Sequence, residues 1–130
     1  MRKSEASGFT VIELLIVVVI IAILAAITIP KAASIRTKAH IATVTAELKN
    51  LATLQEIYMG EQQEYAPNIA TLGMTVSPAV TISVDQATDT GWAATATHTG
   101  LDGRFCSIYY GNSSPTNVDP AASPGLVACN

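Results

Sequence analysis

The ten residues SGFTVIELLI, from Ser7 to Ile16, contain the feature that decides the fold of this 130-residue chain. A short charged leader ends at Gly8, an apolar run begins at Phe9, and one carboxylate, Glu13, stands inside that run. An ionisable group inside an apolar span is energetically costly, so by default it indicates a function. Glu13 is therefore the first candidate functional residue.

The apolar run extends from Phe9 to Ile29 and is long enough to cross a membrane. Only Thr10, Glu13 and Thr28 interrupt it. As a helix it would be about 31 Å long, the thickness of the hydrocarbon core of a bilayer. Its Leu, Ile and Val residues contribute roughly −4 to −8 kcal/mol to insertion, against at most about +3 kcal/mol for Glu13. Membrane insertion is therefore favoured.

The run is not typical of a cleaved secretory signal. Such signals have an apolar stretch of about 7 to 15 residues followed by a small-residue cleavage site. Here the stretch is longer, and Ala26 is followed by Ile27 rather than by such a site. The remaining candidate site is Gly8, where a leader carrying Arg2 and Lys3 would face the cytoplasm under the positive-inside rule.

The sequence MRKSEASG followed by FTVIELLIVVVIIAILAAITIP resembles the leader and N-terminal segment of a type IV pilin. The resemblance implies that a prepilin peptidase cleaves after Gly8 and methylates the new amino group of Phe9. It also implies that Glu13 acts in assembly and that Pro30 kinks the helix. The similarity is close over about the first 50 residues and beyond them is one of architecture. Ala22 is a departure, because many pilins have glycine there.

In an apolar assembly, Glu13 needs a cationic or hydrogen-bonding partner. The resemblance supplies the amine of Phe9, on a newly docked or neighbouring subunit. The alternative is a carboxylate that reaches the headgroups at the cytoplasmic face. Pro30 lacks a backbone donor and crowds the carbonyl of Ala26, which leaves local unwinding between Ile23 and Pro30 open.

Beyond Pro30 the pattern becomes amphipathic. Apolar residues recur at helical spacing, with Gln55 in the remaining position of the stripe: Ile41, Val44, Leu48, Leu51 and Tyr58. We expect one helix from Phe9 to about Gly60, whose second half packs against a sheet; a coiled coil is the less supported alternative. A histidine such as His40 is more often a surface residue than a ligand, and no role is assigned to it.

The remainder predicts an α+β fold, in which the long N-terminal helix packs on a small antiparallel sheet. The predicted organisation is a leader (1–8), a membrane-spanning and filament-core helix (9–29) and one globular domain (30–130). Within that domain we expect a connecting loop at about 61–78, with a short turn of helix at 68–72, and a sheet at about 79–111. The predicted strands are Ala79–Val84, Trp92–Thr97 and Arg104–Tyr110, with Leu126–Cys129 as a short closing strand.

Two cysteines, Cys106 and Cys129, lie on the non-cytoplasmic side of the span. An even number of cysteines in an exported domain favours a disulfide, and two free thiols are the alternative. A bridge would close the loop 106–129 and stabilise the fold by roughly 3 kcal/mol. This arrangement is similar to the C-terminal disulfide loop of many pilins.

Charge and motifs exclude several function classes. From residue 50 to 130 Arg104 is the only basic Lys or Arg residue, against seven acids, so we expect no direct nucleic-acid binding. No nucleophile motif, phosphate-binding loop or metal-ligand pattern is present, so we predict neither an enzyme nor a cofactor. Asn112 begins an N-x-S glycosylation pattern, which is too short to be specific.

The resemblance implies a structural subunit of a bacterial type IV pilus. The precursor would lie in the inner membrane, and the mature chain in an extracellular filament. The implied partners are like subunits, the prepilin peptidase, and an assembly platform with its ATPase. The alternatives are a minor pilin, a type II secretion pseudopilin, or an anchored binding domain that never polymerises. A calcium-binding loop of the pseudopilin kind is disfavoured, because Asp119 is the only acid between residues 112 and 128.

Overall fold

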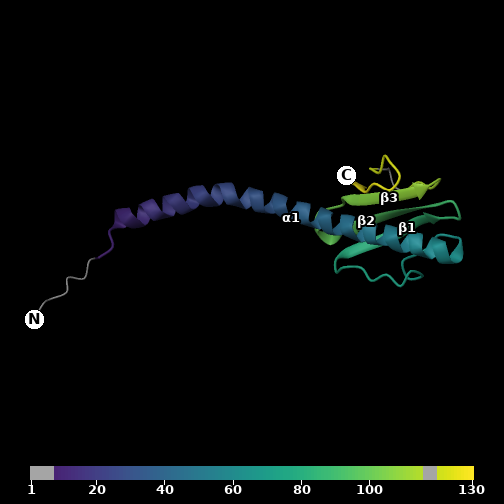
Figure 1. The fold of residues 1–130 in the computed structure, drawn as a ribbon. Helices are drawn as coiled ribbons and strands as arrows, with labels where there is room; N and C mark the ends of the chain where they lie inside the picture. The colour runs from purple at the N-terminus through teal and green to yellow at the C-terminus, as the bar shows by residue number, and fades with distance from the viewer. Residues whose placement is uncertain (1–7, 116–119) are drawn as a thin grey trace, which may run out of the picture. The chain divides into compact units, whose positions relative to one another are not determined.

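The computed structural model describes residues 8–115 and 120–130 and divides into two units, residues up to Arg36 and residues Thr37–Asn130. The first helix, α1 (Val11–Gln62), contributes to both. The globular unit adds β1 (Val80–Ala87), β2 (Gly91–His98), a short 3-10 helix η1 (Thr99–Leu101), β3 (Phe105–Gly111) and β4 (Ala128–Cys129) (Figure 1).

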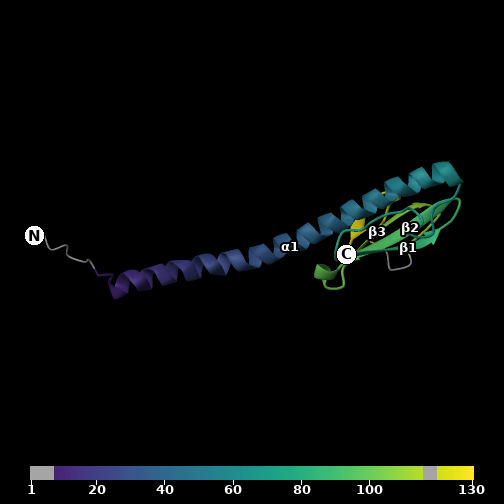
Figure 2. The same cartoon turned by 90° about the horizontal axis from the view of Figure 1, so that it is seen from below.

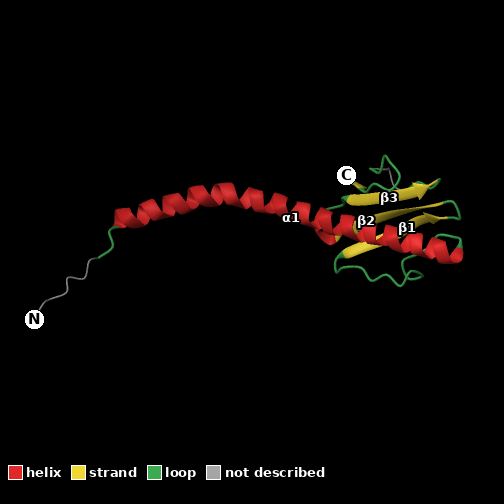
Figure 3. Ribbon diagram, in the orientation of Figure 1, coloured by secondary structure: helices red, strands yellow, loops and turns green. Residues whose placement is uncertain are grey.

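The strands form one antiparallel sheet in the order β1-β2-β3-β4. From Thr37 onwards α1 lies across one face of this sheet, so the globular unit has two layers (Figures 2 and 3). This confirms the predicted fold of a long helix packed on an antiparallel sheet. β1 forms one edge, and its register slips by one residue between Val84 and Gln86, where Asp85 is inserted as a β-bulge.

The predicted helical stripe forms the helix side of the core. Val44, Leu48 and Leu51 have no exposed surface, while the small side chains of Ala94 and Ala96 on β2 are equally buried. All five belong to one apolar cluster. Apolar residues spaced three and four apart share one face of a helix, so burial of this face explains why the segment is helical.

Gln55 is the polar member of this stripe, and it is fully buried. Its side-chain NH₂ donates to the carbonyl of Ala66 (2.9 Å), and its oxygen accepts from the N–H of Ala66 (2.8 Å). The αβ loop, residues 63–79, is thereby attached to the helix. Further along this loop, Ser77 donates its N–H (3.0 Å) and its hydroxyl to Oε1 of Glu47.

The helix ends two residues beyond the predicted end at about Gly60. α1 continues to Gln62, and Gln63 then adopts a left-handed conformation with φ of 64°. The N–H of Gln63 bonds to the carbonyl of Met59 (3.0 Å), which closes the last turn. The expected turn of helix at residues 68–72 is also absent; hydrogen-bonded turns occupy residues 69–73 instead.

Pro30 lies inside α1, which is continuous through the segment where local unwinding was left open. Just before it, the hydroxyl of Thr28 bonds to the carbonyl of Leu24 (2.8 Å). A threonine that bonds back to the preceding turn often bends a helix, as does a proline. In the isolated chain these two residues are accommodated without a break.

The cysteines form the predicted disulfide, between Cys106 on β3 and Cys129 on β4. Each is the register partner of the other. Asn130 extends the pairing, because it exchanges hydrogen bonds with the backbone of Phe105. The C-terminal segment is thus bound to the edge of β3 both covalently and through its backbone.

Candidate functional site

The first turn of α1 holds the carboxylate that the sequence singled out. Oε2 of Glu13 accepts hydrogen bonds from the backbone N–H and the hydroxyl of Thr10, both at 2.8 Å. The N–H of Glu13 in turn donates to the hydroxyl oxygen of Thr10 (3.3 Å). These reciprocal bonds form a capping box, in which two polar side chains satisfy N–H groups that have no partner inside the helix.

Sequence reasoning missed the role of Thr10. The spacing T-x-x-E before an apolar run is itself a signal for a helix start at this position. The sequence marks Glu13 as an acid inside an apolar span, for which a partner from outside its own turn is expected. In the structure its nearest partner is three residues away in the same chain.

The bond between Gly8 and Phe9 precedes the helix. Gly8, Phe9 and Thr10 belong to neither helix nor strand, and the side chain of Phe9 is 77% exposed. A Cβ built on Gly8 would meet no atom of the described residues within 4 Å, so packing among those residues does not require glycine here. The rest of the leader, including Arg2 and Lys3, lies outside the described residues.

The apolar half of α1 has no partner within the described chain. Every Val, Leu and Ile side chain from Val11 to Ile29 is at least 45% exposed. This segment is long and apolar enough to cross a membrane. Contiguous apolar surface of this extent is unusual on a soluble monomer and marks an interaction with lipid or protein.

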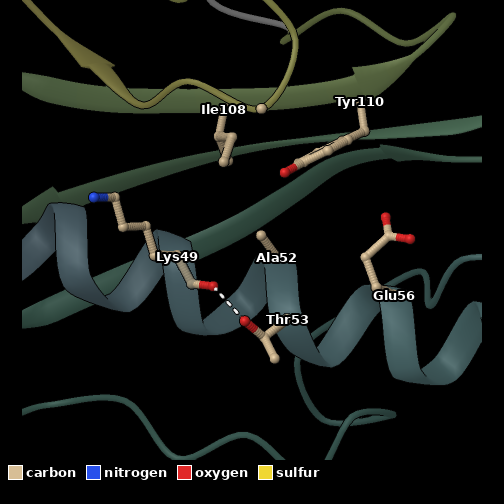
Figure 4. Close-up of a pocket in the computed structure, with 7 residues that line it drawn as sticks. Lys49, Ala52, Thr53, Glu56, Ile108 and Tyr110 are labelled. Atoms are coloured by element: carbon tan, nitrogen blue, oxygen red, sulfur yellow. Dashed lines mark hydrogen bonds between the residues drawn. The ribbon is translucent and has the colours of Figure 1, made fainter.

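The globular unit contains a shallow hollow of about 320 Å³ between α1 and β3 (Figure 4). Ala52 faces Ile108 and Tyr110 across it, while Lys49 and Glu56 lie toward its two ends. None of the sequence-predicted site residues lines it. Within residues 8–115 and 120–130, no three His, Cys, Asp or Glu side chains come together in a way that could hold a metal ion.

Comparison with known proteins identifies the family. The family described as the prokaryotic N-terminal methylation motif matches residues 3–29. Over 129 residues the chain is 38% identical to the type IV wide pilus major component PilA4 of Thermus thermophilus, and the alignment covers 92% of this chain and 98% of that protein. The chain belongs to the type IV pilin family. A pilin is a structural protein that polymerises into pili, and not an enzyme.

A second relative bears on the pseudopilin alternative. The type II secretion system core protein G of Pseudomonas aeruginosa is 36% identical to the pilin over 58 residues. That alignment covers 45% of this chain and 41% of the relative, whereas the alignment to the pilus component covers nearly all of both proteins. The similarity therefore favours a pilin over a pseudopilin. Asp119, which entered the argument against a calcium site, lies outside the described residues.

Proposed function

We propose that this pilin is the repeating subunit of a type IV pilus. Its apolar helix anchors the precursor in the inner membrane until a prepilin peptidase cleaves after Gly8 and methylates the amine of Phe9. The subunit then enters the filament through an assembly platform and its cytoplasmic ATPase. The observation that carries this proposal is the exposed apolar half of α1, whose first turn holds a carboxylate close to the proposed new N-terminus.

The geometry around Gly8 supports cleavage at this position. A peptidase acts on a chain whose backbone it can reach, and this bond lies outside the helix with exposed residues on both sides. The described residues leave room for a side chain at Gly8, so a glycine at this position is consistent with a requirement of the peptidase. The capping box fixes the start of the helix at Val11 and so keeps residues 8–10 out of it.

The same geometry links cleavage to the charge of Glu13. Cleavage turns the Phe9 nitrogen into an ammonium group, one residue before the Thr10 N–H that Glu13 already accepts. An uncompensated carboxylate in an apolar filament would be costly, whereas one paired with an ammonium group and bonded to N–H groups is compensated. Before cleavage no such cation exists at this position, so the trimmed chain alone is suited to burial among other copies.

Filament entry replaces lipid contacts of the helix with contacts to other helices. These environments are similarly apolar, so the exchange is close to neutral for each residue. A polar contact such as that of Glu13 then has a large influence on which chains enter the filament and on how their helices align with one another. Assembly by machinery, and possible reversal by it, are consistent with so small a net driving force.

The test separates the capping role of Glu13 from its charge. Glu13→Gln retains an oxygen for the N–H of Thr10, because glutamine also serves in capping boxes, but it carries no charge. Glu13→Leu removes both. Cells producing each variant are sheared, and filament protein is quantified while its N-terminal residue is identified by mass spectrometry.

We expect wild-type filaments to begin with methylated Phe9, and both variants to lose most of their filaments. As a matched control, Thr10→Val removes a capping hydroxyl and leaves the carboxylate, so it should still assemble. Normal filament yield from Glu13→Gln would refute the charge pairing and leave only helix capping. Filaments that retain the first eight residues would refute the proposed processing.

A further inference from the structure

The two histidines of the chain stack on one another inside the globular unit. His40 lies on α1 and His98 is the last residue of β2, and their ring centroids are 4.0 Å apart with 24° between the planes. Both side chains are half-buried. The sequence assigned no role to His40, and its stacking on His98 is apparent only in the structure.

His98 also caps η1. Its backbone is extended, and its Nδ1 accepts a hydrogen bond from the N–H of Gly100 at 2.9 Å. An Nδ1 that accepts this bond carries no proton, so the neutral ring holds its proton on Nε2. A proton added to Nδ1 would place one donor against another, and the bond to Gly100 could not persist.

His40 closes the same corner from the helix side. A Cβ built on Gly100 would lie 2.8 Å from Nε2 of His40, so the ring lies directly against the glycine backbone. The next residue, Leu101, is only 2% exposed and belongs to the apolar core. The histidine pair therefore connects α1 to a segment whose third residue is anchored in the core.

Charged residues flank the two histidines in the sequence. Arg36 and Lys38 precede His40 on α1, and Asp102 and Arg104 follow η1 and line a hollow of about 250 Å³ together with Gly100 and Leu101. The register partner of His98 on β1 is the uncharged Val80. Two protonated rings with centroids 4.0 Å apart would repel each other.

We propose that His40 and His98 form an acid-sensitive latch, which holds η1 against α1 while the rings are neutral and releases it when they are protonated. Protonation of Nδ1 of His98 removes the acceptor for the Gly100 N–H, so acid favours the open form. The latch lies within the globular unit and does not depend on filament assembly.

The test compares wild type with His98→Asn in the full-length chain, solubilised in detergent micelles. Asparagine is among the best capping residues, so its oxygen can accept from Gly100, but its side chain has no titratable group. The measurement is hydrogen exchange of the Gly100 amide by NMR at about pH 7.5 and about pH 5. Because residues 99 and 100 are the same in both proteins, intrinsic exchange rates cancel in the ratio.

We expect the exchange rate of Gly100 in wild type, relative to His98→Asn, to rise about three- to tenfold from the higher to the lower pH, as for the loss of one hydrogen bond. The variant His40→Phe keeps a ring stacked on His98 and removes one of the two cations, so it should show a smaller rise. A ratio that is the same at both pH values would overturn the latch. A rise as large in His40→Phe as in wild type would overturn the contribution of His40.

Discussion

Substitution of Gln55 provides the sharpest test of how the globular unit is held together. The substitution Gln55→Leu keeps a side chain of similar size but removes both hydrogen bonds to Ala66, whose backbone is fully buried. Each buried backbone group left without a partner costs about 1–3 kcal/mol, or about 2–6 kcal/mol for the N–H and the carbonyl together. Burial of leucine returns about 1.5–3 kcal/mol. We therefore expect a net destabilisation of about 2 kcal/mol.

The assay is guanidinium denaturation of the full-length chain in detergent, followed by the fluorescence of Trp92. This is the only tryptophan in the chain, it is fully buried, and its ring stacks on Tyr110 with centroids 5.5 Å apart. Its emission therefore reports on unfolding of the globular unit alone. As a matched control, Thr53→Val changes an exposed residue two positions earlier on the same helix and should shift stability by less than about 0.5 kcal/mol.

A second variant gives a distinct signature. Glu at position 55 would accept from the N–H of Ala66 but could donate to its carbonyl only when protonated. Gln55→Glu should therefore be strongly destabilised at neutral pH and recover part of its stability in acid. If Gln55→Leu proves as stable as wild type, the reasoning that these two bonds hold the αβ loop on the helix is refuted.

Two further predictions concern the edges of the globular unit. Replacing both Cys106 and Cys129 by serine should lower the free energy of unfolding by roughly 3 kcal/mol, since the bridge spans a sequence separation of 23. The same denaturation experiment measures this change. A reductant should lower the stability of wild type but not that of the double variant. Burial, and then the carboxylate of Glu56, which accepts from the Tyr65 hydroxyl at 3.2 Å, raise the pKa of Tyr65 above its ordinary value. The unfolded chain therefore loses the Tyr65 proton at a lower pH than the folded chain, and stability should fall as the pH rises through about 10. Tyr65→Phe should show a shallower fall above that pH. Equal slopes for both proteins would contradict the raised pKa of Tyr65.

Sequence periodicity was sufficient to predict the packed face of the helix. Val44, Leu48 and Leu51 repeat at helical spacing, so they form one apolar face, and burial of that face stabilises the helix. The disulfide followed from the even number of cysteines in an exported domain. Both inferences rest on properties that are local in the sequence or independent of the detailed packing.

The contacts that the sequence did not reveal are those made with distant or backbone partners. His40 and His98 are brought together only when the sheet docks on the helix. Gln55 was recognised as part of the stripe, but its partner is the backbone of Ala66, which every residue type possesses and which leaves no sequence signal. Gln63, and not Gly60, adopts the left-handed conformation that follows the helix, and its N–H bonds to the carbonyl of Met59.

The extra residue in β1, Asp85, has a consequence for globular units that lie close together in a filament. An edge strand with regular, unpaired backbone groups can template further strands and so begin amyloid-like aggregation. In β1 the insertion of Asp85 interrupts the ladder at mid-strand, and its carboxylate is held by the hydroxyl of Thr95 at 2.6 Å. A neighbouring strand that paired with β1 would meet an interrupted ladder at this point. We expect this interruption to disfavour association of neighbouring globular units through their sheets.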